Sequence, residues 1–238
     1  MIFLLLMNSG CKILKPITPE TGHFYLNQGD EFPQIARVVV FEFQNYSNDV
    51  DISMKLTRAV TESLQKKHLF TIQAFERSDP AWQKLDLKPT SSYSMEELLA
   101  IRKQLRADAV LYGSITRYHP YPHLTVGLHL KMVDLRSGRL LWAIEQIWDS
   151  TDKLVEHRMR EFYKKYMRSS YGPMDWELLI TSPRAFNKFV VYEVAETFNM
   201  ISRYGKKHLS SENIKNFREN SAIFKKNIER PGKTLKFS

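Results

Sequence analysis

The clearest strand pattern in the chain is Leu124-Thr-Val-Gly-Leu-His-Leu-Lys-Met-Val-Asp134. Its apolar members, Leu124, Val126, Leu128, Leu130 and Met132, alternate with Thr125, Gly127, His129, Lys131 and Val133. Alternation with period two indicates a strand with one face on a core, and we expect His129 on the solvent side. Residues 134–138 read as a turn, with Gly138 suited to positive φ. Leu140, Trp142, Ile144 and Trp148 then project from a returning strand, so the pattern predicts an antiparallel hairpin.

The residues before this hairpin alternate between strand and helix patterns. The β-rich run 37–43 predicts a buried strand, and 69–75 predicts a second one. Between them, Ile52, Leu56, Ala59, Val60 and Leu64 fall at helical spacing, with Asp49 or Asp51 available to cap the helix. Ser94-Met-Glu-Glu97 has capping-box spacing and opens a further helix. Residues 110–116 predict a third strand, in which Gly113 indicates a bulge or a close backbone approach.

Helical patterns follow the hairpin. Residues 152–169 are charged and amphipathic, with Leu154, Met159, Phe162, Tyr163 and Tyr166 as the apolar stripe. Ser182-Pro183 begins a last helix, since proline is favoured in the first turn. The predicted fold class is therefore α/β (α+β): a mixed sheet of about five strands in the order strand, helix, strand, helix, three strands, followed by C-terminal helices.

Cys11 is the single cysteine of the 238 residues and follows an apolar run, residues 2–7, and the small residues Ser9-Gly10. This order is similar to the lipobox of bacterial lipoproteins, in which the signal peptide is cut before a cysteine that is then lipidated. No Lys or Arg precedes the apolar run, so we expect the natural start to lie upstream. An incidental cysteine in a frayed terminus is the alternative. Lys12 stands where an Asp would signal inner-membrane retention, which favours the outer membrane.

Composition suggests four segments: a signal peptide at 1–10, the lipidated cysteine with a linker at 11–36, one globular domain at 37–204 and a basic tail at 205–238. The linker contains Pro16, Pro19, Gly22, Gly29 and Pro33. The tail holds seven lysines and two arginines against three glutamates between residues 206 and 236, about two thirds of the net charge of +9. Such a tail is either a contact for an anionic surface or a solvated extension.

Three stretches carry a resemblance to known proteins: 37–47 with its Asn-x-Ser, 107–116 with its Ala-Asp-Ala entry, and 130–142 with its Asp, Gly and Trp. Together they resemble the family that includes the curli secretion lipoprotein CsgG, the synthase-activating lipoprotein LpoB and the N-terminal domain of TolB. The resemblance spans about residues 36–148. It implies a lipid-anchored protein of the bacterial envelope with an α/β domain, and a cysteine carrying several acyl chains, such as palmitate.

Few residues suggest chemistry. His119-Pro-Tyr-Pro-His123, with His129 beyond, lacks the carboxylate or cysteine ligands of a zinc site, so we expect no metal and no cofactor. The stiff loop with Tyr118, His119, Tyr121 and His123 instead suits contact with a protein partner, because rigid aromatic side chains make good anchors. Asp149, Asp152 and Glu156 lie at a helix start, where carboxylates stabilise the dipole.

The best basic patch comprises Arg158, Arg160, Lys164, Lys165 and Arg168, interleaved with tyrosines. It either contacts single-stranded nucleic acid or forms the solvated side of an amphipathic helix.

The sequence thus predicts a non-enzymatic, lipid-anchored protein on the periplasmic face of the outer membrane. It would serve as a scaffold or assembly factor for a secretion, flagellar or cell-wall machine, with envelope proteins as partners and a homo-oligomer left open. The alternative is a soluble nucleic-acid-binding protein that uses the basic tail and residues 158–168.

Overall fold

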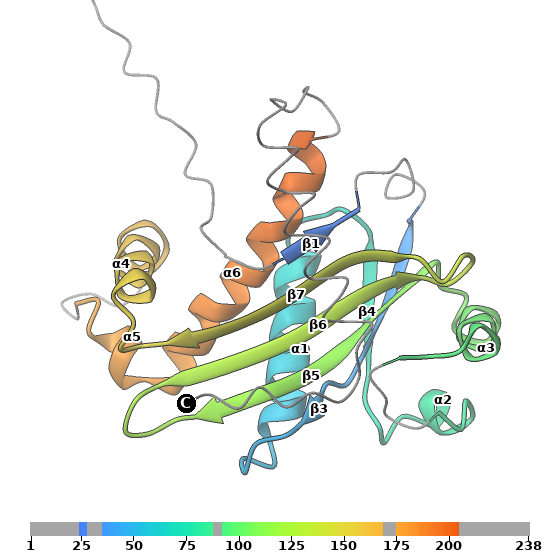
Figure 1. The fold of residues 1–238 in the computed structure, drawn as a ribbon, viewed down its shortest axis with the longest axis horizontal. Helices are drawn as coiled ribbons and strands as arrows, with labels where there is room; N and C mark the ends of the chain where they lie inside the picture. Colours follow the sequence, from blue (N-terminus) through green and yellow to red (C-terminus); the bar gives the residue numbers. More distant parts are fainter. Residues whose placement is uncertain (1–23, 28–34, 88–91, 169–174, 205–238) are drawn as a thin grey trace, which may run out of the picture.

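The computed structural model describes residues 24–27, 35–87, 92–168 and 175–204 (Figure 1). Seven strands form one mixed sheet. They are β1 (Phe24–Leu26), β2 (Arg37–Phe41), β3 (Gln44–Asn45), β4 (Thr71–Phe75), β5 (Ala109–His119), β6 (Thr125–Asp134) and β7 (Leu140–Asp149). The helices are α1 (Ile52–Gln65), α2 (Pro80–Gln83), α3 (Met95–Leu105), α4 (Lys153–Phe162), α5 (Leu178–Thr181) and α6 (Pro183–Tyr204), with a π-helical segment, Tyr163–Met167, after α4.

The strands lie in the order β1-β7-β6-β5-β2-β4, and β3 also pairs with β5. β2 is parallel to both β4 and β5, as expected when helices α1 and α3 connect successive strands. β5, β6, β7 and β1 are antiparallel to their neighbours. The predicted mixed α+β fold is therefore confirmed. The two strands that sequence reasoning missed, β1 and β3, are three and two residues long, too short to show a period.

β1 lies inside the segment predicted as a linker. Its residue Phe24 pairs with Ile144, and Leu26 pairs with Trp142. The sheet thus begins before residue 37, where we expected the domain to start.

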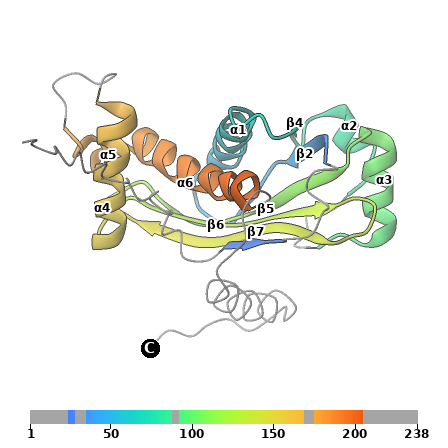
Figure 2. The same ribbon diagram turned by 90° about the horizontal axis from the view of Figure 1, so that it is seen from above.

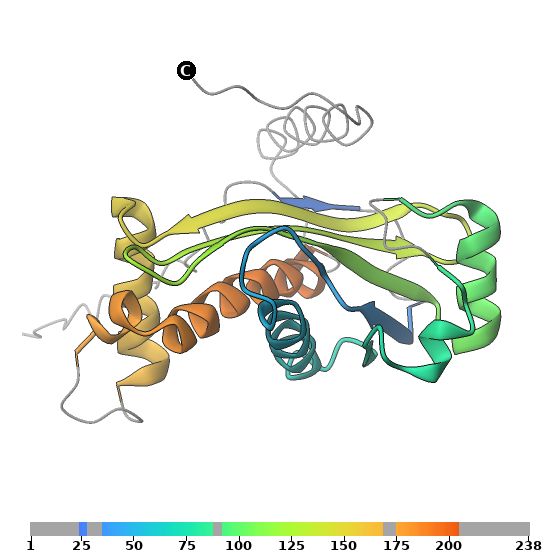
Figure 3. The ribbon, with the colours of Figure 1, turned by 90° about the horizontal axis from the view of Figure 1, so that it is seen from below.

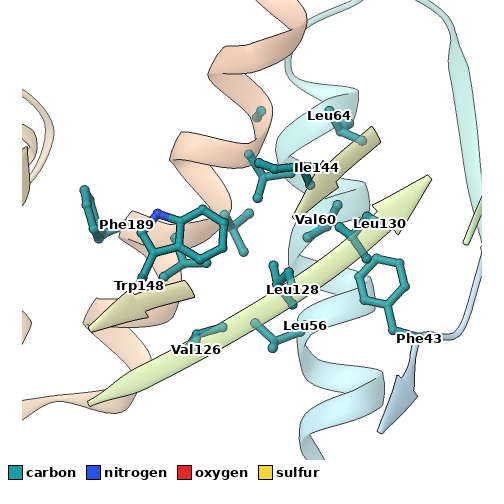
Figure 4. Packing of buried hydrophobic residues seen from close by; sticks show 14 of the residues in the cluster. Phe43, Leu56, Val60, Leu64, Val126, Leu128, Leu130, Ile144, Trp148 and Phe189 are labelled. Carbon is teal, nitrogen blue, oxygen red and sulfur yellow. The ribbon is translucent and has the colours of Figure 1, made fainter. Parts of the chain in front are cut away.

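Helices α1 and α6 cover one face of the sheet, while α3 closes one end and α4 and α5 lie at the other (Figures 2 and 3). The main core fills the space between the sheet and helices α1 and α6. Figure 4 shows Leu56, Val60 and Leu64 of α1 beside Val126, Leu128 and Leu130 of β6. All six side chains are at most 1% exposed, and full burial of such a side chain contributes about 1.5–3 kcal/mol.

A second core lies on the opposite face of the sheet, because successive strand residues point to opposite sides. Val39 and Phe41 of β2 pack there with Trp82 of α2 and Ile101 of α3. The Phe41 and Trp82 rings meet edge to face at 4.2 Å. Val133 of β6 also belongs to this second core, and Leu140 of β7 packs against it. The β6–β7 hairpin therefore contacts two cores, whereas the sequence predicted one.

The predicted helix caps are confirmed in one case and corrected in the other. Ser94 accepts from the Glu97 N–H at 3.2 Å, and the Glu97 carboxylate accepts from the Ser94 N–H at 2.6 Å, so the capping box is present. Asp51 precedes α1 but makes no side-chain cap. Asp49 instead accepts from the Asp51 N–H in the preceding turn.

The predicted stripe of α4 is wrong at its start. Leu154 is 64% exposed and Val155 is buried in its place. Both residues are apolar, so the sequence alone leaves the phase of the helix ambiguous, and the π-helical turn after Phe162 shifts it further.

Gly113 shows the predicted close approach. A Cβ built on it would lie 2.0 Å from the carbonyl oxygen of His129 on β6. The register shift in this strand pair lies farther along, between Ile115 and Arg117.

Candidate functional site

The Asn-x-Ser motif shapes the turn between β3 and α1. The side-chain oxygen of Asn45 accepts hydrogen bonds from the Ser47 N–H at 2.9 Å and from the Ser47 hydroxyl at 2.7 Å. The Asn45 amide donates to the carbonyl oxygen of Asp49 at 2.5 Å. Asparagine favours such turns because its side chain bonds the backbone two residues on. Its role here is structural.

Asp108, from the Ala-Asp-Ala entry, joins three parts of the chain. One carboxylate oxygen accepts from the N–H groups of Ala36 and Arg37, both at 3.0 Å. The other accepts from the guanidinium of Arg136 at 3.3 Å. Asp108 therefore holds the start of β2 and the β6–β7 turn against the start of β5.

The Asp, Gly and Trp of the third motif are structural as well. Asp134 accepts from the N–H groups of Arg136 and Ser137 at 2.6 and 2.9 Å, and Gly138 has a φ of +69°. The Trp142 indole donates to the Thr197 hydroxyl of α6 at 3.0 Å. All three motifs thus maintain the fold and none provides a reactive group.

Of the four side chains predicted to contact a partner, one is buried and three are exposed. Tyr118 is 8% exposed and belongs to the main core, and its burial raises the pKa of its phenol. His119, Tyr121 and His123 are exposed, Tyr121 by 84%. Tyr118 therefore packs into the core just before the β5–β6 loop, and the other three side chains form the surface available to a partner.

The predicted basic patch is largely paired with carboxylates. Arg158 donates to Glu193 of α6 at 2.7 Å, Arg160 to Glu156 at 2.6 Å, and Lys164 to Glu161 at 2.9 Å. The Arg160 guanidinium also stacks 4.0 Å from the Trp176 ring.

The other two cations of the patch are exposed. Lys165 lies 4.9 Å from the ring of Tyr166, and Arg168 follows the π-helical segment. The helix therefore presents less unbalanced positive charge than its sequence suggests, which weakens the case for nucleic-acid binding through this segment.

The histidines and the carboxylates at the start of α4 were considered as possible metal ligands. Across the described ranges, no group of three or more His, Cys, Asp or Glu side chains could hold a metal ion. Asp152 caps α4 by accepting from the N–H groups of Leu154 and Val155. Asp149 accepts from the N–H and hydroxyl of Thr151 at 2.8 and 2.7 Å. These carboxylates have the structural role predicted for a helix start.

A recess lies on the face of the sheet opposite α1 and α6. Its volume is about 260 Å³, and its lining comes from three adjacent strands and the residue after β3: Gln44, Tyr46, Tyr112, Gly113, Ser114, Thr116, His129 and Lys131. Sequence reasoning missed it, because the polar positions of the hairpin were expected to face solvent. His129 is instead half-buried, and burial lowers the pKa of its imidazole.

Cys11 and the basic tail lie outside the described residues. Among the helices that are described, none is long and apolar enough to cross a membrane.

Comparison with known families decides the relationship. Residues 18–146 match the family described as peptidoglycan-synthase activator LpoB, which is more than half of the chain. The chain belongs to the LpoB family. The match includes strands β1 to β6 and the part of β7 up to residue 146.

Solved structures resemble the chain distantly. The PelC dodecamer from Paraburkholderia phytofirmans shares 16% identity over 56% of this chain and 86% of its own, with a TM-score of 0.39. Lipoprotein GNA1162 from Neisseria meningitidis shares 19% sequence identity over 54% of this chain and 96% of its own, with a TM-score of 0.39. The LpoB C-terminal domain from Salmonella enterica shares 16% sequence identity over 48% of this chain and 82% of its own, with a TM-score of 0.33. No curated protein sequence matches the chain.

Membership of the LpoB family confirms the coarser expectations. The family is a regulatory activator of peptidoglycan synthases and not itself an enzyme, so a non-enzymatic, cell-wall-related envelope protein is the right class. The secretion and flagellar alternatives, and the resemblance to CsgG and TolB, gain no separate support.

Proposed function

We propose that this chain is a lipid-anchored protein of the outer membrane that reaches into the periplasm and activates a peptidoglycan synthase by direct contact. The observation that carries the proposal is the LpoB family match over residues 18–146. The match includes strands β1 to β6 and most of β7, and so includes the β5–β6 hairpin that the proposal uses as the contact surface.

The anchor in this proposal is Cys11, cut free of residues 1–10 and acylated. Several acyl chains hold a protein firmly at a membrane, whereas a single chain holds it only weakly. Lys12 at the next position favours the outer membrane. Because β1 begins at Phe24, the connection between the anchor and the sheet is shorter than the linker expected from composition.

The contact surface in this proposal is the tip of the β5–β6 hairpin. Tyr118 at its base is buried, while Tyr121 at its tip is 84% exposed between two prolines. A large ring held on a stiff loop loses little conformational freedom on binding, which favours affinity. His119 and His123 flank it and can donate or accept hydrogen bonds.

A reconstituted synthase assay tests the proposal. The purified full chain is added to a peptidoglycan synthase from the same source, and glycan polymerisation is followed with and without it. We expect stimulation by the unaltered chain and a loss of about tenfold in apparent affinity when Tyr121 is replaced by Ala, as for a central aromatic anchor.

Leu99→Ala is the matched control. Leu99 is also apolar and 45% exposed, but it lies on α3. Stimulation should be unchanged by this substitution. A chain that binds no synthase, or that loses affinity equally through Leu99→Ala, would contradict the proposal.

A further inference from the structure

Strand β4 forms one side of the sheet and lacks the features that usually protect such an edge. Among the described residues it pairs with β2 alone, over all five of its residues and without a register shift. Edge strands are commonly protected by charged residues, proline, a bulge or shortness. β4 reads Thr71-Ile-Gln-Ala-Phe75 and has no charge, proline or glycine. The strand at the other side of the sheet, β1, is only three residues long.

The backbone of β4 presents hydrogen-bonding groups along this edge. The Thr71 N–H donates to the Ala36 carbonyl at 2.8 Å, and the Phe75 carbonyl accepts from the first N–H after β2 at 3.0 Å. Backbone groups of successive strand residues alternate in direction, so the N–H and C=O groups of Ile72 and Ala74 point away from β2. These groups form a template for a further strand.

We propose that a second copy of this chain pairs with this edge, β4 against β4, antiparallel about a two-fold axis beside Gln73. In this register Ile72 lies opposite Ala74 of the second copy. The two residues exchange both of their N–H···O bonds, and the axis repeats the exchange. Every outward backbone group of Ile72 and Ala74 is thereby used. The inference goes beyond the proposed function and does not rest on it.

Charge favours a second copy as the occupant of the edge. The residues that precede β4, Lys66-Lys67-His68, are basic, whereas Glu76-Arg77-Ser78-Asp79, which follow it, hold two acidic residues against one arginine. Antiparallel pairing brings the basic end of each copy beside the acidic end of the other, and complementary charge of this kind fixes register. Parallel pairing would instead place like charges together.

The residue at the axis, Gln73, can bond its own counterpart. Its side chain is exposed, and its oxygen accepts from the Arg37 guanidinium at 3.1 Å. The NH₂ group of Gln73 can then donate to the oxygen of Gln73 in the second copy, since an amide oxygen has two lone pairs. A charged residue at this position would face its own charge across the axis, which is destabilising.

Cysteine crosslinking tests the register, because Cys11 is the only thiol of the chain. In the full chain with Cys11→Ala, Gln73→Cys places two thiols across the axis. Directly opposite residues of this kind have Cα atoms about 4.5 Å apart, and disulfides span about 4.4–6.8 Å. Air oxidation catalysed by copper–phenanthroline should therefore convert most of this variant to a covalent dimer.

Thr71→Cys in the same chain is the matched control. Thr71 is exposed on the same strand and the same face as Gln73, but it lies opposite Phe75 of the second copy. Its two copies are therefore separated by four strand residues, roughly 13 Å, and should not crosslink.

Sedimentation of the Cys11→Ala chain over the micromolar range measures the association itself. Ala74→Pro removes an outward N–H but no bond to β2, and proline is tolerated on edge strands. It should weaken the dimer at least about tenfold. Gln73→Lys should also weaken it, whereas Thr71→Lys, which places no like charges opposite each other, should not. Circular dichroism checks that each variant is folded.

The proposal is overturned if the chain sediments as a monomer throughout this range, if both cysteine variants crosslink equally, or if Ala74→Pro leaves the dimer intact. Hydrogen exchange identifies another occupant. A monomer in which the amides of Ile72 and Ala74 are protected would assign the edge to a different segment of the same chain.

Discussion

The indole N–H of Trp148 donates a hydrogen bond of 2.6 Å to the carboxylate of Glu193, which joins β7 to α6 inside the main core. The second oxygen of Glu193 accepts from Arg158 of α4 at 2.7 Å. The carboxylate is 5% exposed and the guanidinium 14%. One acidic side chain thus connects three elements, and its loss would leave both donors buried without an acceptor.

Glu193→Ala should therefore lower the free energy of unfolding by about 3–5 kcal/mol, as is typical when one partner of a buried ion pair is removed. Denaturant titration followed by tryptophan fluorescence measures the change. Glu161→Ala is the control, because its pair with Lys164 is exposed on both sides, and such pairs contribute at most about 1 kcal/mol. Equal effects of the two substitutions would show that burial of the Glu193 pair adds nothing.

The pH dependence of this pair has a definite sign. Burial raises the pKa of Glu193, although Arg158 and Trp148 oppose the shift. A carboxyl whose folded-state pKa lies above its unfolded value, about 4.3, stabilises the fold below the unfolded pKa and loses that contribution as pH rises through the folded pKa. Glu193→Gln does not titrate.

The stability of Glu193→Gln relative to the unaltered chain should therefore improve as pH rises from about 4 to 7. Unfolding curves at several pH values measure this difference. A difference that is flat or falls with pH would contradict the raised pKa.

Gly113→Ala should be among the most destabilising glycine substitutions. Its Cβ would meet the His129 carbonyl oxygen at 2.0 Å and the Leu130 Cα at 2.7 Å, both backbone atoms that cannot move without opening the β5–β6 pair. A loss of about 2–3 kcal/mol is expected for overpacking of this kind. A Cβ at Gly138 would make only ordinary contacts, at 3.5 and 3.6 Å. Gly138→Ala should therefore lower the free energy of unfolding by about 1 kcal/mol, because alanine is disfavoured at the positive φ of this residue. Thermal unfolding of both variants gives the ranking, which the opposite order would refute.

Asp108→Ala should cost about 1–2 kcal/mol, because it removes the acceptor of the Ala36 and Arg37 N–H groups, which are exposed and partly buried, and breaks the exposed pair with Arg136. Asp108→Asn retains one acceptor oxygen and should recover part of the loss. Asp51→Ala removes an exposed carboxylate, whose pair with Lys55 spans 3.5 Å, and should be nearly neutral. Chemical denaturation measures the stability of the three variants. If Asp108→Ala is no less stable than Asp51→Ala, Asp108 does not hold the three segments together.

The long, regular elements of this fold can be predicted from the sequence, because their apolar residues recur with the period of a strand or of a helix. The apolar positions of β6 are all at most 1% exposed from Val126 to Met132, as the alternation predicts. Phe186, Phe189, Val190, Val194 and Phe198 of α6 are buried as their helical spacing predicts. In both cases these apolar positions all meet the main core, so the period on that side of the element is unambiguous.

The site could be predicted less well, because it depends on pairing between distant segments. His129 and Lys131 look like solvent-facing residues of a hairpin until Ser114 and Gln44 are placed beside them by β5 and β3. Likewise, the basic residues near 158 look like a patch until Glu193, 35 residues away, is found against Arg158. Such contacts follow from topology, and no local spacing encodes them.

Cys11→Ala tests the anchor that the proposed function requires. Without a thiol no acyl chain can be attached, so the protein should leave the membrane fraction and lose incorporation of labelled palmitate. Density-gradient fractionation of cells that express the full chain measures the membrane association, and the label on the purified protein measures the palmitate incorporation. Lys12→Asp is the matched variant: it retains the thiol, so palmitate incorporation should persist while the protein moves from the outer to the inner membrane. If Cys11→Ala remains bound to the membrane, the lipid anchor is not what holds this chain there. If Lys12→Asp stays in the outer membrane, residue 12 does not direct its sorting.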